Sequence, residues 1–332
     1  MQIRRPLART KLDLPIITVI IPVKPGGFVK SLGPLSRVDY PSDRIEVIVA
    51  EGSQPSVQRN TAAREARGEF LFFLDDDSVV TPGLFREVVK RYADPRVSAV
   101  GGPIITPDSD TYLQKGFGLA LGSPFGGSSV RARYKKLGAE RAATENELIL
   151  ANLSFRKRVF LDAGGFNENL YPNEENELMN RLQDEGHVFL YVPDLFIYRS
   201  QRTSYRLYLK QVFTYGRGRM DQNYAHPEGF RPLHIAPSLF LLYLLSLPFS
   251  HNNVYFFPIF LYLVLCAVFS AGAAAEGKSP LHVLVMPWLF LSLHAGYGAG
   301  FIWGALKGAA GAGKRPPYTG GVVLRRVEPG GE

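Results

Sequence analysis

The residues best suited to chemistry in this sequence are three adjacent carboxylates, Asp75, Asp76 and Asp77, which directly follow the apolar run FLFFL. Adjacent carboxylates repel one another, and a divalent cation would relieve that repulsion. Oxygen ligands suit Mg²⁺ or Mn²⁺, and Mg²⁺ is typically held by one or two carboxylates together with substrate phosphates. Since alternate residues of extended backbone point to opposite sides, Asp75 and Asp77 can share a face while Asp76 points elsewhere. The competing interpretation is an acidic turn before a helix at Thr81-Pro82.

Short apolar strands that alternate with a helix are expected to position these carboxylates. The expected strands are 16–22, 45–50, 70–74 and 97–100, and the expected helix is 56–67. Continuous apolar runs of this length are typical of strands buried on both faces of a parallel sheet. Such sheets bind ligands at the carboxyl ends of their strands. The fold class predicted for the first part of the chain is therefore α/β with a mostly parallel sheet.

The charge distribution separates this part from a very different one. The chain has 332 residues and a net charge of +8, but residues 232–306 contain only Glu276 and Lys278 as charged residues. A soluble surface needs roughly a quarter of charged residues. The partition excludes a wholly soluble globule, and the charged first part excludes a polytopic transporter. Cys266 is the only cysteine, which excludes a disulfide or zinc framework.

Three apolar segments, 233–249, 254–275 and 280–306, are candidates to cross a membrane, which takes about 20 residues. The second and third are the stronger candidates, because the first is short and contains Pro237 and could lie in the interface. Glycines in the third segment would let helices approach closely. Basic residues flank the apolar region on both sides, and if both flanks stay cytoplasmic the number of crossings is even. Two crossings with an interfacial segment and three crossings both remain open.

These boundaries predict five regions. They are a basic leader (1–14), an α/β domain (15–198), a basic juxtamembrane segment (199–232), a membrane region of two or three helices (233–306) and a basic flexible tail (307–332). The expected location is the inner (cell) membrane, with several crossings and the α/β domain in the cytoplasm.

Four motifs occur in order along the α/β part. They are ITVIIPVK (17–24), IEVIVAEGS (45–53), QRNTAAREARGEFLFFLDDDS (58–78) and ANLSFRKRVFLDAGGFNENLYPNEENELMNRLQDEG (151–186). This series resembles the family 2 inverting glycosyltransferases over about residues 15–220. The resemblance implies a GT-A fold, a Rossmann-like nucleotide-sugar-binding domain. The segment after Arg199 and the glycine-rich stretch 294–308 look like the membrane-attached branch that includes exopolysaccharide (succinoglycan-type) enzymes.

The resemblance implies a donor site for a nucleotide-diphosphate sugar. Asp75 and Asp77 match a DxD motif that holds Mg²⁺ or Mn²⁺ at the donor diphosphate. Glu51 stands where the family usually has an aspartate that contacts the base or ribose, although a solvated turn acid is the alternative. The implied donor-binding set is Pro22, Glu51, Arg59, Asn60, Asp75 and Asp76. For Arg59, a surface helix arginine is the competing interpretation.

The resemblance also implies a catalytic base. The family's Glu-Asp pair before a helix aligns with Glu174 and Glu175. In an inverting transfer one carboxylate deprotonates the acceptor hydroxyl as it attacks the anomeric carbon. Glu175 takes the position of the catalytic aspartate, with Glu174 as the fallback. The alternative is that Glu174, Glu175 and Glu177 only favour the positive start of a helix.

Two further elements are implied to face the acceptor. Gly165 and Phe166 would form a turn beneath it, and Gln211, Arg217 and Arg219 would close over the site at the membrane surface. Both arginines could pair with phosphate oxygens of the donor or of a lipid acceptor. A basic collar that binds anionic headgroups is the competing interpretation.

The predicted function is inverting transfer of one sugar from a nucleotide-diphosphate sugar to a lipid-linked or membrane-proximal acceptor, with membrane lipid as a partner and no nucleic acid. Two departures from the family pattern keep alternatives open: glutamate replaces aspartate at positions 51 and 175, and segment 53–58 is short. One alternative is a catalytically silent partner of another transferase. The other is a nucleotidyl- or phosphosugar transferase that uses the same acidic metal site.

Overall fold

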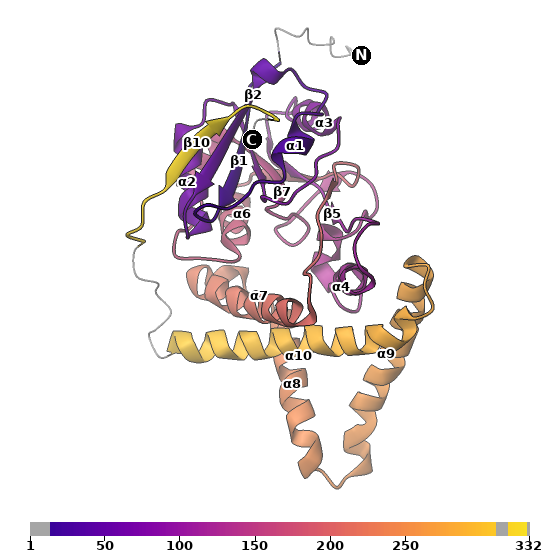
Figure 1. Cartoon of the computed structure of the whole chain (residues 1–332). Coiled ribbons are helices and arrows are strands. Elements are labelled where there is room, and N and C mark those ends of the chain that lie inside the picture. The colour runs from indigo at the N-terminus through magenta and orange to yellow at the C-terminus, as the bar shows by residue number, and fades with distance from the viewer. Residues whose placement is uncertain (1–13, 310–317, 331–332) are drawn as a thin grey trace, which may run out of the picture.

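The computed structural model describes residues 14–309 and 318–330 (Figure 1). The predicted basic leader (1–14) lies outside the described residues except for its last position. The strands are β1 (Ile17–Val23), β2 (Ile45–Glu51), β3 (Phe70–Leu74), β4 (Val97–Gly101), β5 (Ile104–Ile105), β6 (Arg141–Ala142), β7 (Asn152–Arg156), β8 (Val188–Tyr191), β9 (Ile197–Tyr198) and β10 (Val323–Val327). The α-helices are α1 (Leu32–Leu35), α2 (Pro55–Glu65), α3 (Leu84–Arg91), α4 (Tyr112–Gly122), α5 (Lys157–Asp162), α6 (Glu174–Asp184), α7 (Tyr205–Ala225), α8 (Ala236–Ser246), α9 (Phe257–Glu276) and α10 (His282–Ala309).

A mixed sheet forms the centre of the α/β part. Within the described residues its order is β10-β2-β1-β3-β7-β4-β8-β6. Strands β2, β1 and β3 are parallel neighbours, and β4 and β8 run in the same direction, whereas β10, β7 and β6 run against them. The prediction of a mixed, mostly parallel sheet is confirmed. The predicted strand 70–74 coincides with β3, and the predicted helix 56–67 with α2 to within two residues.

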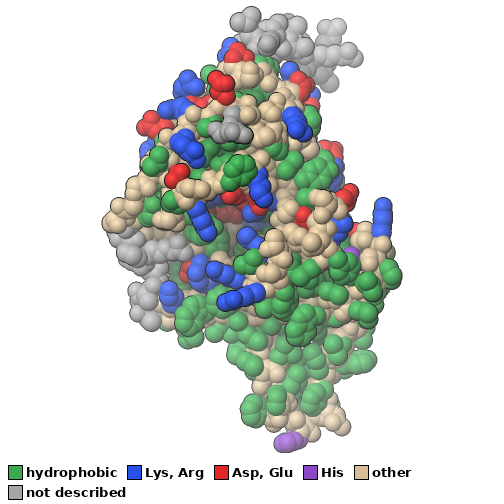
Figure 2. Space-filling model, viewed as in Figure 1, with side chains coloured by type: hydrophobic (Ala, Val, Ile, Leu, Met, Phe, Trp, Pro, Cys, Tyr) green, Lys and Arg blue, Asp and Glu red, His purple; other side chains and the backbone are tan. Residues whose placement is uncertain are grey.

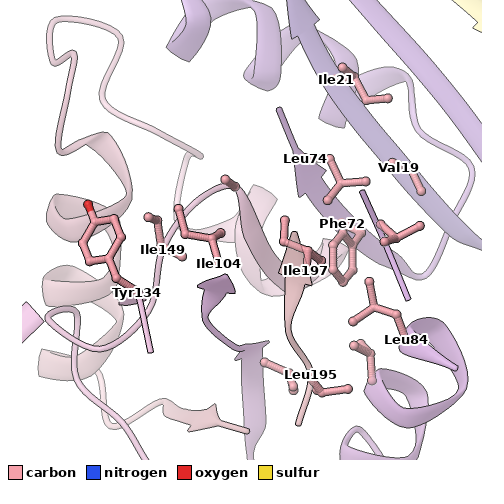
Figure 3. Close-up of a cluster of buried hydrophobic side chains, with 14 of the residues drawn as sticks. Val19, Ile21, Phe72, Leu74, Leu84, Ile104, Tyr134, Ile149, Leu195 and Ile197 are labelled. Atoms are coloured by element: carbon pink, nitrogen blue, oxygen red, sulfur yellow. The ribbon is translucent and has the colours of Figure 1, made fainter. Parts of the chain in front are cut away.

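The apolar runs of the strands fill two cores, one on each face of the sheet. In β3, Phe72 and Leu74 point to the core shared with α1 and α3, whereas Leu71 and Phe73 point to the core shared with α2, α5 and α6. Figure 3 shows the first of these, where Leu84 of α3 packs on Phe72. Because both faces are covered, every residue of β3 is buried, as expected for a continuous apolar strand.

The C-terminal part contains three helical segments long and apolar enough to cross a membrane: Pro232–Phe249, Asn253–Glu276 and His282–Ala309. Helices α8 and α9 project away from the α/β domain as a hairpin (Figure 1). Helix α10 runs crosswise to them, between the hairpin and the α/β domain, and packs along α7. The third apolar segment, a strong candidate for crossing by length, therefore lies against the domain in a different orientation from the other two.

Glycines allow α7 and α10 to pack closely. A Cβ atom added at Gly216 of α7 would lie 2.0 Å from the carbonyl oxygen of Tyr297, and one at Gly300 of α10 would lie 1.9 Å from that of Phe213. Both distances are far below any van der Waals contact. The predicted close approach through small residues is confirmed, and α7 is the main partner of α10.

The end of the chain returns to the sheet. Strand β10 pairs antiparallel with β2, from Val323 opposite Glu51 to Val327 opposite Val47. The prediction of a flexible tail is wrong for these residues, because Arg326 reaches Glu46 at 3.1 Å and gives the strand a buried ionic partner. Residues 310–317 of the predicted tail lie outside the described residues. The segments before and after the apolar helices thus share one sheet.

Candidate active site

The acidic motif lies at the carboxyl end of β3, where Arg199 bridges two of its side chains. The Nη2 atom of Arg199 lies 3.0 Å from Asp75 Oδ2, and its Nε donates to Asp77 Oδ1 at 2.8 Å. Arg199 follows directly after β9, which ends at Tyr198. One guanidinium can span both carboxylates because Asp75 and Asp77 share a face, as the alternation of the backbone predicted.

The surroundings of this motif shift the pKa values of Asp75 and Asp76 in opposite directions. Burial would raise the pKa of Asp75, but Arg199 and then Arg59 reverse that effect and lower it below its ordinary value. For Asp76, burial raises the pKa, and repulsion from Asp77 and Asp75 adds to the shift. Asp75 is therefore held as a carboxylate, while Asp76 accepts a proton more readily than Asp75 does.

Arg59 connects the acidic motif to the second group of carboxylates. It extends from α2, is buried, and places Nη2 at 3.3 Å from Asp75 Oδ1 and Nη1 at 2.8 Å from Glu174 Oε1. The competing interpretation of a surface helix arginine is wrong, because only 5% of Arg59 is exposed. The two acidic groups thus belong to one site.

Glu174 and Glu175 form the first turn of α6 and are both buried. Burial raises the pKa of Glu174 to about 7, although Arg59 acts to lower it. Glu175 has a looser partner, since its Oε1 lies 3.8 Å from Arg133 Nη1. Their place in the first turn also stabilises the helix, so the dipole interpretation holds alongside any chemical role.

A cavity of about 530 Å³ joins these groups to the C-terminal helices. Its charged lining has five arginines and three acids: Arg59, Arg133, Arg199, Arg202, Arg219, Asp75, Glu174 and Glu175. The lining continues through apolar side chains of α8, α9 and α10. Figure 2 shows acidic and basic side chains around a hollow just above the hydrophobic lower part of the molecule. The excess of positive charge suits an anionic ligand.

Three of the predicted site residues, Asn60, Gly165 and Phe166, do not line this cavity but have a structural role. Asn60 accepts from the backbone N–H of Phe166 at 2.9 Å and donates to the Phe166 carbonyl at 2.8 Å. Gly165 has a φ of +73°, and a Cβ atom there would lie 2.6 Å from the Asn60 amide oxygen. The ring of Phe166 packs on Phe73 and Phe160 in the core. These residues fix the turn before α6, and the Phe166 side chain does not face an acceptor.

The predicted closing element lies on α7, and its members face different ways. Arg219 lines the cavity. Arg217 donates to the Tyr171 carbonyl at 3.0 Å and lies 3.6 Å from Asp221. Gln211 accepts from Arg202 at 3.1 Å and donates to the Tyr215 hydroxyl at 2.6 Å. Arg219 is thus the member of the three that the structure brings to the acidic site.

Pro22 and Glu51 lie near the carboxyl ends of β1 and β2, beside the returning tail. Glu51 accepts from the Gly26 N–H at 3.1 Å and lies 3.7 Å from Arg325 of β10. Ser53 contacts the Tyr318 hydroxyl at 3.3 Å. The tail therefore covers the edge of the sheet next to segment 53–58, which is short compared with the family pattern.

The carboxylates of the acidic motif are suitable ligands for a divalent cation, but in this structure they are paired with the guanidinium of Arg199. Asp75 and Asp77 offer the oxygen ligands that Mg²⁺ and Mn²⁺ accept, on one face and at a strand end. Within residues 14–309 and 318–330, no group of three or more His, Cys, Asp or Glu side chains is arranged to hold a metal. Two carboxylates would thus need phosphate or water oxygens to complete the shell, and the guanidinium would have to withdraw.

Sequence reasoning missed two residues of the site. Arg199 was only one of several basic residues before the apolar region, and Arg133 was not singled out at all. Arg133 donates to the backbone carbonyl of Asn146 at 2.9 Å and approaches Glu175 from a 3₁₀ turn. Neither residue belongs to a local motif, so no sequence signal separated them from the other arginines.

The chain is similar to known glycosyltransferases in sequence. The model of a family described as "Glycosyl transferase family group 2" matches residues 70–303. The pre-mycofactocin glycosyltransferase of Mycobacterium tuberculosis is 24% identical over 191 residues, which cover 58% of this chain and 39% of that protein. The chain therefore spans well under half the length of this curated relative.

A solved structure resembles most of the chain. The mannosyltransferase PcManGT from Pyrobaculum calidifontis, in complex with GDP-Man and Mn²⁺, aligns with a TM-score of 0.54 at 19% identity and covers 91% of each chain. At 19% identity this similarity shows the fold alone. The predicted GT-A-like α/β fold followed by apolar C-terminal helices is confirmed.

Proposed function

The chain belongs to glycosyl transferase family group 2, and on that basis we propose that it transfers a glycosyl group, with inversion, from a nucleotide-diphosphate sugar to an acceptor at a membrane. The observation that carries the proposal is the single cavity that contains Asp75, Glu174 and Glu175 and continues into the apolar helices. A donor site, a base and a membrane-facing acceptor path meet there. The succinoglycan-type branch remains our assignment from the motifs.

In the proposed reaction the acceptor oxygen attacks the anomeric carbon from the face opposite the diphosphate. The bond from that carbon to the diphosphate oxygen breaks, and its electron pair leaves with the nucleoside diphosphate. The acceptor proton goes to Glu175, which we propose as the base because the one ion pair it forms with a described residue, Arg133, is 3.8 Å long. Glu174 is held by Arg59 at 2.8 Å and would position that arginine.

On the donor side, Asp75 and Asp77 would hold Mg²⁺ or Mn²⁺, which supplies positive charge to the departing diphosphate. The Mn²⁺ named with the similar mannosyltransferase supports this assignment. Arg199 would have to leave the carboxylates, and its side chain then carries a positive charge beside the diphosphate. Arg59 keeps Asp75 and Glu174 in fixed relation during the transfer.

We further propose that α8 and α9 cross the membrane as a hairpin while α10 lies along its surface. The pairing of β10 with β2 supports an even number of crossings, because it keeps the segments before and after the apolar region together. Trp288 and Trp303 are exposed on α10, as is usual for helices at the level of the lipid headgroups. The basic residues that flank the apolar region support a cytoplasmic location of the α/β domain.

A thermal-shift panel tests the transfer function. Purified full chain in detergent is mixed with nucleoside diphosphates and nucleotide sugars, each with and without Mn²⁺. At least one nucleotide is expected to raise the apparent Tm in the presence of Mn²⁺, because a ligand that binds only the folded state stabilises it. Incubation of the purified chain with that nucleotide sugar and a membrane extract should then yield a glycosylated product. The proposal is wrong if no member of the panel binds.

Single-cysteine variants test the crossing number. With Cys266 replaced by serine, Arg158→Cys reports on the α/β domain, Glu328→Cys on the strand end beside β10 and His251→Cys on the hairpin tip. In sealed vesicles, a membrane-impermeant maleimide should reach positions 158 and 328 from one side and position 251 from the other. Labelling of 158 and 328 from opposite sides would mean an odd number of crossings.

A further inference from the structure

The end of the chain holds an aromatic side chain beside the carboxyl end of β2. The backbone N–H and the hydroxyl of Ser53 both donate to the Tyr318 hydroxyl at 3.3 Å, and that hydroxyl donates to the Gly321 carbonyl at 3.4 Å. A Cβ atom at Gly320 would lie 2.5 Å from the same hydroxyl, so the turn closes tightly around it. The Tyr318 side chain is still partly exposed. Its ring is therefore held in a fixed position and remains accessible to a ligand.

Strand β10 anchors this turn to the sheet. Arg326 lies 3.1 Å from the buried Glu46, and Leu324 packs against the core on the α2 face. These contacts fix the register that brings the first residue of β10 opposite Glu51. The position of Tyr318 thus follows from the pairing of the tail with the sheet.

Glu51, the last residue of β2, contacts both the tail and the loop after β1. Its carboxylate accepts from the Gly26 N–H at 3.1 Å and lies 3.7 Å from the Arg325 guanidinium. The Glu51 side chain is 24% exposed. An ionised carboxylate has about four acceptor positions, so these two contacts leave some of them free. Glu51 can therefore accept hydrogen bonds from a ligand that reaches this edge of the sheet.

The strand order places this edge within reach of a ligand bound at the acidic motif. Strand β1 lies between β2 and β3, and neighbouring strands are about 4.8 Å apart, so the strand ends that carry Glu51 and Asp75 are about 10 Å apart. The 530 Å³ cavity is lined by Asp75 and Arg59 but not by Glu51 or Tyr318. A nucleoside diphosphate with its phosphates at Asp75 would extend out of the cavity, over the end of β1, toward the tail.

We propose that the tail completes the donor site, with the Tyr318 ring packed against the base and Arg325 orienting the Glu51 carboxylate toward the nucleoside. This inference rests on the proposed function, because it takes the donor to be a nucleotide. A flat ring and a carboxylate suit the face and the N–H groups of a base. The family model matches residues 70–303, so the tail lies outside it and its role is particular to this chain.

A comparison of whole nucleotides with their phosphates alone tests this role. The purified full chain in detergent is titrated with GDP, UDP and pyrophosphate, each with Mn²⁺. In Tyr318→Ala, the nucleotide that the wild type binds is expected to bind about tenfold more weakly, because base–aromatic stacking contributes in this range. Pyrophosphate affinity should stay unchanged, because the phosphates lie at Asp75. Tyr318→Phe keeps the ring and should lose less nucleotide affinity than Tyr318→Ala.

Two neighbouring arginines of β10 form a matched pair of variants. Successive residues of a strand point to opposite faces, and Arg325 pairs with Glu51 whereas Arg326 pairs with Glu46. Arg325→Gln should weaken the nucleotide about two- to fivefold, since its ion pair is half-exposed. Arg326→Gln removes an equal charge and should lower the apparent Tm while nucleotide affinity stays near the wild-type value.

Two results would overturn the inference and leave the proposed function standing. One is unchanged nucleotide binding in Tyr318→Ala. The other is an equal loss of nucleotide and pyrophosphate affinity, which would mean that the tail only supports the fold. A wild-type chain that binds neither GDP nor UDP would refute the proposed function together with this inference. Should Tyr318→Ala fail to fold, equal nucleotide affinities of Arg325→Gln and Arg326→Gln would overturn the inference.

Discussion

Two pairs of carboxylates, Asp75 with Asp77 and Glu174 with Glu175, belong to one site, and the pKa values of Asp75 and Glu174 are shifted in opposite directions. Asp75 and Asp77 share the guanidinium of Arg199, and the pKa of Asp75 is lowered although burial would raise it. Glu174 has an arginine at 2.8 Å, yet burial raises its pKa to about 7. A positive neighbour therefore does not by itself decide the charge of an acid; the number of such neighbours and the degree of burial decide it together.

The difference assigns different tasks to the two pairs. A carboxylate that stays ionised and is matched to a cation suits the binding of a metal and a diphosphate. A carboxyl group that exchanges its proton near neutral pH suits proton transfer or the control of a neighbouring base. Groups whose environments push their pKa values apart commonly divide the acid, base and electrostatic roles of an active site.

The largest effect is expected from Glu175→Gln. A missing general base typically lowers the rate about 10²- to 10⁴-fold, and we expect a loss of kcat in this range with donor affinity retained. Product formation from the nucleotide sugar and nucleotide binding are the two measurements. Glu177→Gln on the same helix is the matched control, because Glu177 is paired with Arg181 at 2.7 Å and does not line the cavity. A larger loss in Glu174→Gln than in Glu175→Gln would exchange the proposed roles.

Asp77→Asn should act on the other pair, through donor affinity. Removal of one partner from a charged, partly buried arrangement commonly costs about 2–5 kcal/mol, and we expect at least a tenfold weaker Mn²⁺-dependent binding of nucleoside diphosphate. Asp76→Asn is the comparison, because Arg199 forms its ion pairs within 4.0 Å with Asp75 and Asp77 and not with Asp76, so this variant should lose less affinity. Full transfer activity in Asp77→Ala would contradict the donor assignment and support a catalytically silent partner protein.

The acidic motif was predictable because its context is local. A continuous apolar strand must be covered on both faces, as Phe72 and Phe73 are, and a polar group directly after it must lie at the strand end. The same reasoning placed Asp75 and Asp77 on one face. Glu174 and Glu175 were predictable because they belong to a local motif, the segment 151–186, that resembles the family pattern.

The partners of these acids were not predictable in the same way. Arg199 reaches Asp77 across 122 positions of sequence, and nothing beside it in the chain marks that contact. Phe166 was expected near the acceptor, but its large apolar ring gains more from burial on Phe73. Strand β10 was not predicted, because a basic tail is typically solvated. In the structure, however, Arg326 forms an ion pair with the buried Glu46. Long-range ion pairs and burial decide these positions.

Arg199→Ala tests whether the motif has a resident cation. Without the guanidinium, two partly buried carboxylates lose a partner, which destabilises the folded protein. We expect a lower apparent Tm in chelator and a rise with Mn²⁺ that is larger than in the wild type. Mn²⁺ affinity, measured by electron paramagnetic resonance without nucleotide, should increase about tenfold, because the metal no longer competes with a positive charge. Arg202→Ala removes a cavity arginine that acts on Asp75 without an ion pair to it, and should raise Mn²⁺ affinity less than Arg199→Ala does.

The smallest effect is the pH dependence of stability, in which Glu174 and Asp75 should differ in sign. The pKa of Glu174 is raised from 4.5 to about 7 on folding, so between these values the folded chain holds a proton that the unfolded chain releases. Stability is therefore expected to fall as pH rises through this window, by about 2–4 °C in apparent Tm for each kcal/mol. Asp75 has a lowered pKa, so its contribution should be lost only as pH falls below about 3.8. Melting curves from pH 3 to pH 8 measure both. Glu174→Gln should flatten the upper window alone, whereas a slope that persists in this variant would mean that another group titrates there and that Glu174 is not the acid with the raised pKa.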